Sequence, residues 1–173
     1  MEEAKLVKLA RKGDHESFGQ LMMLLKDQAY RIAYCYLHNE HDSMDAVCNA
    51  MEKAFTKLNQ LREPKYFKTW FLKIVINESN QILRSRQQVV ELDVKQFENL
   101  PSKATPEKNE DLEELLNSVE PTERSMIYMK YYLGYSLEEI SRVTDTPLST
   151  VKTKIYRNLK QLREKLVQRE ALQ

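Results

Sequence analysis

The sequence has few of the residues that make tight turns: its 173 residues include three glycines and five prolines. An all-β fold needs many such turns, whereas this chain is rich in Leu, Lys, Glu, Gln and Ala, which favour helices. With 42% apolar and 31% charged residues, the composition is typical of a globular protein rather than a disordered one. We therefore expect an all-α protein.

A long apolar run is also missing. No segment approaches the roughly twenty apolar residues that cross a bilayer. Residues 1–12 alternate charged with apolar side chains, unlike a secretion signal. We therefore expect a cytoplasmic protein with no direct membrane insertion.

Cysteine and histidine are scarce. Cys35 and Cys48 form no C-x-x-C pair and fall on apolar positions of helical patterns, so we interpret both as reduced core thiols. His38 and His41 lie in a predicted turn without the four-ligand spacing of structural zinc. The chain also lacks a glycine-rich phosphate loop, a convincing Ser/His/Asp pattern and a paired-acid motif. The sequence thus predicts no catalytic residue, metal or cofactor, and a protein that is not an enzyme.

Helical periodicity predicts four helices in the first half of the chain. Gly13 closes the first helix, Asp14 caps the second, Asp42 caps the third, and the fourth follows a loop that contains Pro64. The apolar stripes are Leu6, Leu9 and Ala10; Phe18, Leu21, Leu25, Ile32, Ala33 and Tyr36; Met44, Val47, Met51, Ala54, Phe55 and Leu58; and Phe67, Trp70, Phe71, Ile74, Val75, Ile82 and Leu83. Four such helices with short connections bury one common core.

The pattern fades over residues 88–110. This stretch holds Pro101 and Pro106, and its three lysines against five acidic residues give a net charge of −2. We interpret it as a flexible linker. Two small helical domains, residues 1–87 and 111–173, then lie on either side of it.

A helix-turn-helix is predicted in the second domain, because two short helices are joined there by a tight connection over residues 144–148. The end signals are Pro121 and Gly134 for the preceding helix, a capping box of Ser136 and Glu139 for the next, and Ser149 or Thr150 as the cap of the last.

The last helix separates apolar from cationic residues. Its buried face is predicted to hold Val151, Ile155, Leu159, Leu162 and Leu166. Residues 146–173 contain seven basic and two acidic residues (net +5), whereas residues 111–145 contain three and eight (net −5). As the second helix of a helix-turn-helix it fits the DNA major groove, and the acidic half should face away from the DNA.

DNA contacts are expected from the exposed side of this helix. We expect one or both of Thr153 and Arg157 to contact base edges, whereas Lys152 and Lys154 are predicted to hold phosphates. The full predicted set is Ser149, Thr150, Lys152, Thr153, Lys154, Tyr156, Arg157 and Lys160.

Sequence motifs in both halves resemble bacterial sigma factors of the extracytoplasmic-function (ECF) group. "YSLEEISRVTDTPLSTVKTKIYRNLKQLREKL" resembles their promoter-recognition module, with Lys154 in place of a usual arginine. "YFKTWFLKIVIN" is similar to F-x-x-W-L-x-x-I-A-x-N of the promoter-melting module, and "GDHESFGQLM" is similar to the opening G-D-x-x-A-F-x-x-L. Asp45 occupies the aspartate of D-x-V-Q-E, but Cys48-Asn49 replaces Gln-Glu and removes a carboxylate.

The resemblance implies an alternative sigma factor that binds core RNA polymerase and directs transcription from a stress or cell-envelope regulon. Expected partners are the beta-prime clamp helices, the beta flap, promoter DNA and an anti-sigma factor. Residues 1–87 would bind polymerase and recognise and melt the downstream promoter box, and residues 111–173 would read the upstream box. The implied polymerase-binding residues are Asp45, Cys48, Asn49 and Glu52, and those for the downstream box are Arg62, Lys65, Lys68, Trp70, Phe71, Lys73, Asn77, Arg84 and Arg86.

Several alternatives stay open at this point. Trp70 and Phe71 fit core packing as well as stacking on an unpaired base. The chain as a whole also fits a stand-alone helix-turn-helix regulator that binds paired half-sites as a dimer. A third interpretation is a degenerate sigma-like protein that docks on polymerase or an inhibitor without reading DNA.

Overall fold

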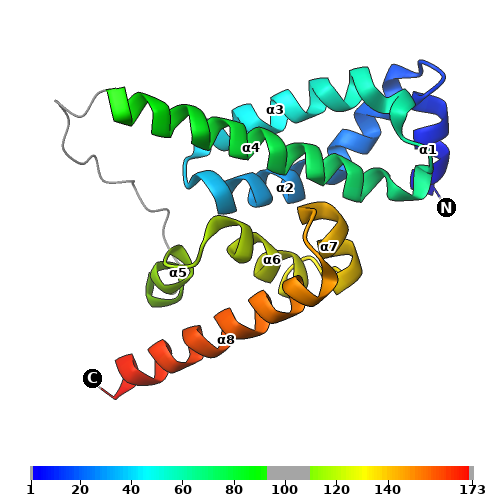
Figure 1. Ribbon diagram of the computed structural model, residues 1–173. Coiled ribbons are helices and arrows are strands. Elements are labelled where there is room, and N and C mark those ends of the chain that lie inside the picture. The colour runs from blue at the N-terminus through cyan, green and yellow to red at the C-terminus, as the bar shows by residue number, and fades with distance from the viewer. Residues whose placement is uncertain (1, 93–109, 172–173) are drawn as a thin grey trace. The chain divides into compact units, whose positions relative to one another are not determined.

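The computed structural model describes residues 2–92 and 110–171, which form two compact units (Figure 1). The secondary structure of these described residues consists of helices joined by short connections, without a strand. The α-helices are α1 (Glu2–Ala10), α2 (His15–Leu37), α3 (Glu40–Lys57), α4 (Phe67–Leu92), α5 (Glu110–Asn117), α6 (Pro121–Tyr131), α7 (Leu137–Thr144) and α8 (Leu148–Glu170), and two short 3-10 helices span Leu58–Gln60 and Pro64–Tyr66. The predicted all-α fold is confirmed, and no described helix has the length and apolar character to cross a membrane.

In the first unit, α2, α3 and α4 pack on one another, and α1 packs on α2. Ala46, Ala50 and Ala54 are fully buried at four-residue intervals on α3, so small side chains face the neighbouring helices. Phe67 and Phe71 of α4 are fully buried with their rings stacked, 6.3 Å between centroids. Alanines from one helix and large aromatic rings from another thus share a single core.

Leu9 of α1, at 37% exposure, and three positions of α3 that we expected in the core are instead exposed. Met44 is 56% and Phe55 44% accessible to solvent, and Cys48 is exposed as well, so interpreting Cys48 as a core thiol is wrong. Cys35 is partly buried. The apolar residues of α3 cover a wider arc of the helix than the face that packs, because three alanines already fill the space between the helices.

Helix α3 begins earlier than predicted. His38 adopts a left-handed conformation (φ 46°) that ends α2, and the side chain of Asn39 accepts a hydrogen bond from the Asp42 backbone N–H at 2.9 Å. Asn39 is therefore the N-cap, and the prediction of Asp42 is wrong. Asp42 instead lies in the first turn and forms an ion pair with Arg86.

The start of the predicted linker also needs correction. Helix α4 continues to Leu92, because residues 88–92 contain neither glycine nor proline to end it. Glu110 belongs to α5. The rest of the predicted linker, residues 93–109, lies outside the described residues.

The second unit contains a helix-turn-helix formed by α7 and α8. Ser136 and Glu139 form the predicted capping box, with N–H to side-chain distances of 3.1 and 2.8 Å. Asp145 turns the chain with φ 49°, and Pro147 directly precedes α8. Ser149 and Thr150 thus lie inside the first turn of α8, and their predicted capping role is wrong.

A continuous core holds the second unit together. Leu115 and Val119 pack with Ile127 of α6 and Leu162 of α8, and Leu159 and Leu166 lie against this cluster. Val151 and Ile155 are buried where α8 meets the rest of the unit. The predicted apolar face of α8 is confirmed, so the opposite face of the same helix is available to other molecules.

Candidate nucleic-acid interface

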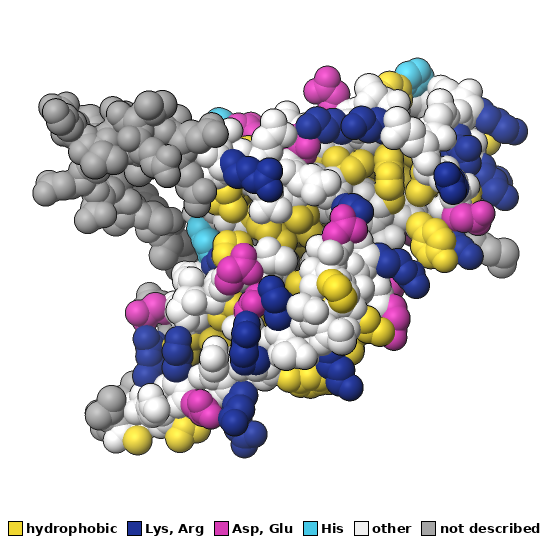
Figure 2. Space-filling view, viewed as in Figure 1, with side chains coloured by type: hydrophobic (Ala, Val, Ile, Leu, Met, Phe, Trp, Pro, Cys, Tyr) yellow, Lys and Arg dark blue, Asp and Glu magenta, His cyan; other side chains and the backbone are white. Residues whose placement is uncertain are grey.

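Helix α8 presents the predicted cationic face to solvent. Of the eight residues predicted to contact the upstream box, six are exposed, and Thr150 and Lys154 are partly buried. Ser149, Thr150, Thr153, Lys154 and Arg157 line a shallow hollow of about 250 Å³ near the start of the helix. Several Lys and Arg side chains are visible along α8 in Figure 2. The first three turns of α8 therefore combine hydroxyl groups with cations on one accessible surface.

Two of these cations bind an acidic residue of α6. Lys154 Nζ lies 3.2 Å from the Glu123 carboxylate, and one guanidinium nitrogen of Arg157 donates to both carboxylate oxygens at 3.0 and 3.1 Å. Asn158 Nδ2 donates to the same carboxylate at 2.5 Å and to the Lys154 carbonyl at 2.8 Å. Glu123 and Asn158 are 8% and 5% exposed. We name Glu123, Lys154, Arg157 and Asn158 the Glu123 cluster.

The charge of Glu123 is stabilised by its neighbours. Burial alone would raise the pKa of the carboxyl, but hydrogen bonds from Asn158, Lys154 and Arg157 outweigh it, so the pKa lies below its usual value. Glu123 is thus ionised at neutral pH. The sequence alone does not reveal this contact, because the partners lie 31 to 35 residues from Glu123 and no local spacing marks it.

The two aromatic residues of α4 that we considered for DNA melting differ in accessibility. Phe71 is fully buried, so predicting that it stacks on a base is wrong, and core packing is its role. Trp70 is partly exposed, with its ring centroid 5.9 Å from that of Phe67. Of this pair, Trp70 alone has ring surface that another molecule could contact.

Polar and basic residues of the first unit lie at several degrees of exposure. Arg62, Lys65, Asn77 and Arg84 are exposed, and the Lys65 ammonium lies 5.0 Å from the centroid of the neighbouring Tyr66 ring. Lys68 and Lys73 are partly buried. Arg86 is paired with Asp42 and also donates to the Leu37 carbonyl at 3.4 Å, which ties α4 to the connection between α2 and α3.

The predicted polymerase-binding residues share one accessible face of α3. Asp45, Cys48, Asn49 and Glu52 recur at helical spacing, and all four are exposed. One turn before Asp45, His41 places its Nδ1 atom 3.2 Å from the Asp45 carboxylate. We name Asp45, Cys48, Asn49 and Glu52 the α3 face.

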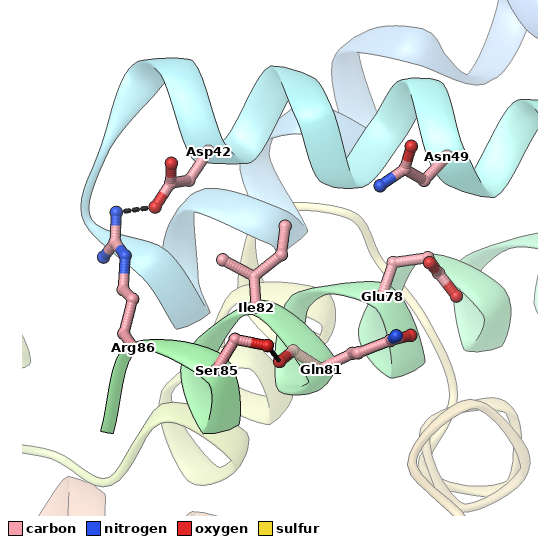
Figure 3. Close-up of a pocket in the computed structure, with 7 residues that line it drawn as sticks. All are labelled: Asp42, Asn49, Glu78, Gln81, Ile82, Ser85 and Arg86. Carbon is pink, nitrogen blue, oxygen red and sulfur yellow. Dashed lines mark hydrogen bonds and ion pairs between the residues drawn. The ribbon is translucent and has the colours of Figure 1, made fainter. Parts of the chain in front are cut away.

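Beside this face, a groove of about 540 Å³ runs between α3 and α4 (Figure 3). The Asp42–Arg86 ion pair lies at one end, and Ser85 donates to the Gln81 carbonyl. The Glu78 carboxylate accepts a 2.6 Å hydrogen bond from Lys53. The groove is lined by Asp42, Asn49, Glu78, Gln81, Ile82, Ser85 and Arg86.

These features define a helical protein of two units, one with a helix-turn-helix and one with a polar helix face. Residues 21–89 match the family model of Sigma-70 region 2, and residues 109–162 match that of Sigma-70, region 4. The chain belongs to the sigma-70 family of RNA polymerase sigma factors, in the ECF group.

Individual relatives extend over most of the chain. RNA polymerase sigma factor SigV of Bacillus subtilis is 31% identical over 146 residues, which cover 84% of this chain and 88% of SigV. The ECF sigma factor SigW of the same organism is 26% identical, with 94% and 95% covered.

Solved structures share the fold. The sigma factor RpoE, in complex with the anti-sigma factor NepR from Bartonella quintana, has a TM-score of 0.74 at 21% identity, with 87% of this chain and 97% of RpoE covered. CnrH, in complex with the cytosolic domain of CnrY, has a TM-score of 0.72 at 19% identity, with 96% and 97% covered.

Proposed function

We propose that this chain is an alternative sigma factor, a non-enzymatic protein that binds core RNA polymerase and directs initiation at a specific set of promoters. The observation that carries the proposal is the presence of both sigma-70 regions in one chain, each within its own helical unit. A stand-alone regulator needs the helix-turn-helix but not region 2. Such a protein would act in the cytoplasm, where promoter DNA and polymerase are found.

The division of work follows the two units. We assign the upstream promoter box to the accessible side of α8, where Lys152, Thr153 and Tyr156 are exposed. We assign recognition and opening of the downstream box to the first unit, with Trp70 stacking on an unpaired base and Arg62 and Lys65 contacting phosphates. Aromatic rings bind unpaired bases without a need for sequence-specific hydrogen bonds.

Protein partners are assigned on the same basis. The α3 face would dock on the beta-prime clamp helices, and the second unit would contact the beta flap. The complex of the sigma factor RpoE with the anti-sigma factor NepR supports an anti-sigma factor as a further partner of this chain. We further assign the chain to a stress or cell-envelope regulon.

Reconstituted transcription tests the proposal. Core polymerase is incubated with genomic fragments, with and without the protein, and transcript start sites are mapped. We expect promoter-specific transcripts that depend on the protein and are lost in Lys152→Glu, but not in a matched Lys165→Glu variant further along α8. Polymerase binding without specific transcripts would instead favour an interaction protein. DNA binding to paired half-sites without polymerase would favour a stand-alone regulator.

A further inference from the structure

Two of the four cations between residues 149 and 160 are already paired with a carboxylate inside the protein. Lys154 and Arg157 share the carboxylate of Glu123, whereas Lys152 and Lys160 are exposed. The three charges of the Glu123 cluster sum to +1 instead of the +2 that the two cations alone would present. The cationic face of α8 is therefore weaker toward DNA than its sequence indicates.

The position of Glu123 lets it compete with DNA for Lys154 and Arg157. It lies in the first turn of α6, outside the helix-turn-helix pair, and its side chain is 10% exposed, against 55% for Arg157 and 32% for Lys154. On its buried side, the Glu123 carboxylate accepts a hydrogen bond from Asn158. The Asn158 side chain is itself buried and also donates to the Lys154 carbonyl. The cations are thus open to solvent on one side, while Glu123 holds them from the protein side.

We propose that Glu123 is a positioning residue that sets the specificity of the upstream-box contact by withholding Arg157 and Lys154 from DNA that cannot replace its hydrogen bonds. This inference rests on the proposed function, because it assumes that α8 reads promoter DNA. One guanidinium nitrogen of Arg157 bridges both oxygens of Glu123, and the O6 and N7 atoms of guanine offer two acceptors that can take the place of this carboxylate. A phosphate on non-specific DNA must compete with Glu123 for the same cations, so Lys154 and Arg157 add less to non-specific binding than Lys152 and Lys160.

Salt dependence provides the measurement. Each phosphate contact adds about one unit to the slope of log affinity against log salt concentration. We expect Glu123→Gln holoenzyme to bind non-specific DNA with a slope steeper by about one to two units, and to discriminate less between the upstream box and scrambled DNA, by roughly tenfold. Glutamine retains an oxygen that accepts from Asn158, so the packing of α6 on α8 has a conservative replacement.

Control variants separate this effect from a change in net charge or from misfolding. Glu164→Gln removes the same charge from an exposed position on α8 and should leave the slope and discrimination at wild-type values. Arg157→Ala added to Glu123→Gln should return the slope toward wild type, because the released cation is then absent. In the wild-type background, Arg157→Ala should lower the non-specific slope by less than half as much as Lys152→Ala.

The outcomes are distinct. A Glu123→Gln slope equal to that of Glu164→Gln would overturn the inference, as would an Arg157→Ala effect as large as that of Lys152→Ala. The second comparison stands even if Glu123→Gln fails to fold, since both substituted residues are on the surface. The proposed function is tested separately, by reconstituted transcription with the wild-type protein before any variant is compared. If the wild-type holoenzyme makes no promoter-specific transcripts, that result contradicts the proposed function and not the role of Glu123.

Discussion

At the scale of single residues, the adjacent aromatics Trp70 and Phe71 differ in burial. Both lie on the apolar stripe of α4, and periodicity alone does not separate them. The structure buries Phe71 completely and leaves Trp70 partly accessible. A ring that is partly in the core and partly in solvent is suited to packing on one side and to contacting a ligand on the other.

Truncating each ring should therefore have different effects. Phe71→Ala should cost about 3–5 kcal/mol of stability, as for a buried aromatic, and abolish polymerase-dependent activity through unfolding. Trp70→Ala should lose less stability, retain closed-complex formation and impair promoter opening. Thermal melting by circular dichroism, with permanganate footprinting of the promoter, compares the two. An unfolded Trp70→Ala protein would count against a role in opening.

Glu123 gives a prediction for pH. Its pKa is depressed in the folded chain relative to roughly 4.3 in an unfolded one. The unfolded state thus binds a proton first as pH falls, and the stabilising contribution of Glu123, complete above that value, is lost as pH falls through the folded pKa. The stability difference between wild type and Glu123→Gln should therefore shrink on acidification from about pH 5 to pH 3. Urea unfolding at each pH measures it, and a difference that grows would contradict the assignment.

At the scale of elements, helix interiors were predictable and helix ends less so. The apolar periodicity correctly indicated α2, α4 and α8, since burial of one face dominates the choice of residues there. Asp14 and the Ser136–Glu139 box also cap as predicted. The starts of α3 and α8 differ from the prediction because Asn39 caps α3 three residues before Asp42, and because α8 begins after Pro147 without a side-chain cap.

The two serines near the helix-turn-helix test these caps. Ser136→Ala removes the hydrogen bond to the Glu139 N–H and should cost about 1 kcal/mol. Ser149→Ala removes no cap and should change stability by less than about 0.5 kcal/mol. Unfolding followed by circular dichroism, beside the fluorescence of Trp70, the single tryptophan, reports the whole chain and the first unit separately. Equal losses in the two variants would show that the box does not stabilise α7.

The α3 face differs from the family pattern at Asn49. Asn49 stands where the family usually has glutamate, so the chain lacks a carboxylate there. Asn49→Glu should strengthen binding to core polymerase by roughly two- to fivefold, in the range of about 0.2–1 kcal/mol for an exposed ion pair. Asn49→Gln, which matches glutamate in size without charge, should change nothing. Competition binding with labelled wild-type protein measures both, and an equal response would exclude an electrostatic role for this position.

At the scale of the whole molecule, charge is segregated although the net charge is +1. The sequence showed this segregation, along with the two-part organisation, because both depend on composition over tens of residues. It did not show that Glu123, from the acidic half of the second unit, neutralises part of the basic half. That contact depends on how α6 packs against α8, which no local pattern records.

The organisation into two units leads to a prediction about proteolysis. Residues 93–109 contain both prolines of the predicted linker and three lysines, Lys95, Lys103 and Lys108. Lysines within packed helices resist cleavage, because a protease needs an extended backbone that a helix supplies only after local unfolding. Brief digestion with a lysine-specific protease should therefore cut first at these three sites and leave two helical fragments, identified by mass spectrometry. A matched variant with all three lysines changed to arginine should survive the same digestion intact. Earlier cuts within residues 2–92 or 114–171, in wild type or in the variant, would place the boundary between the units elsewhere.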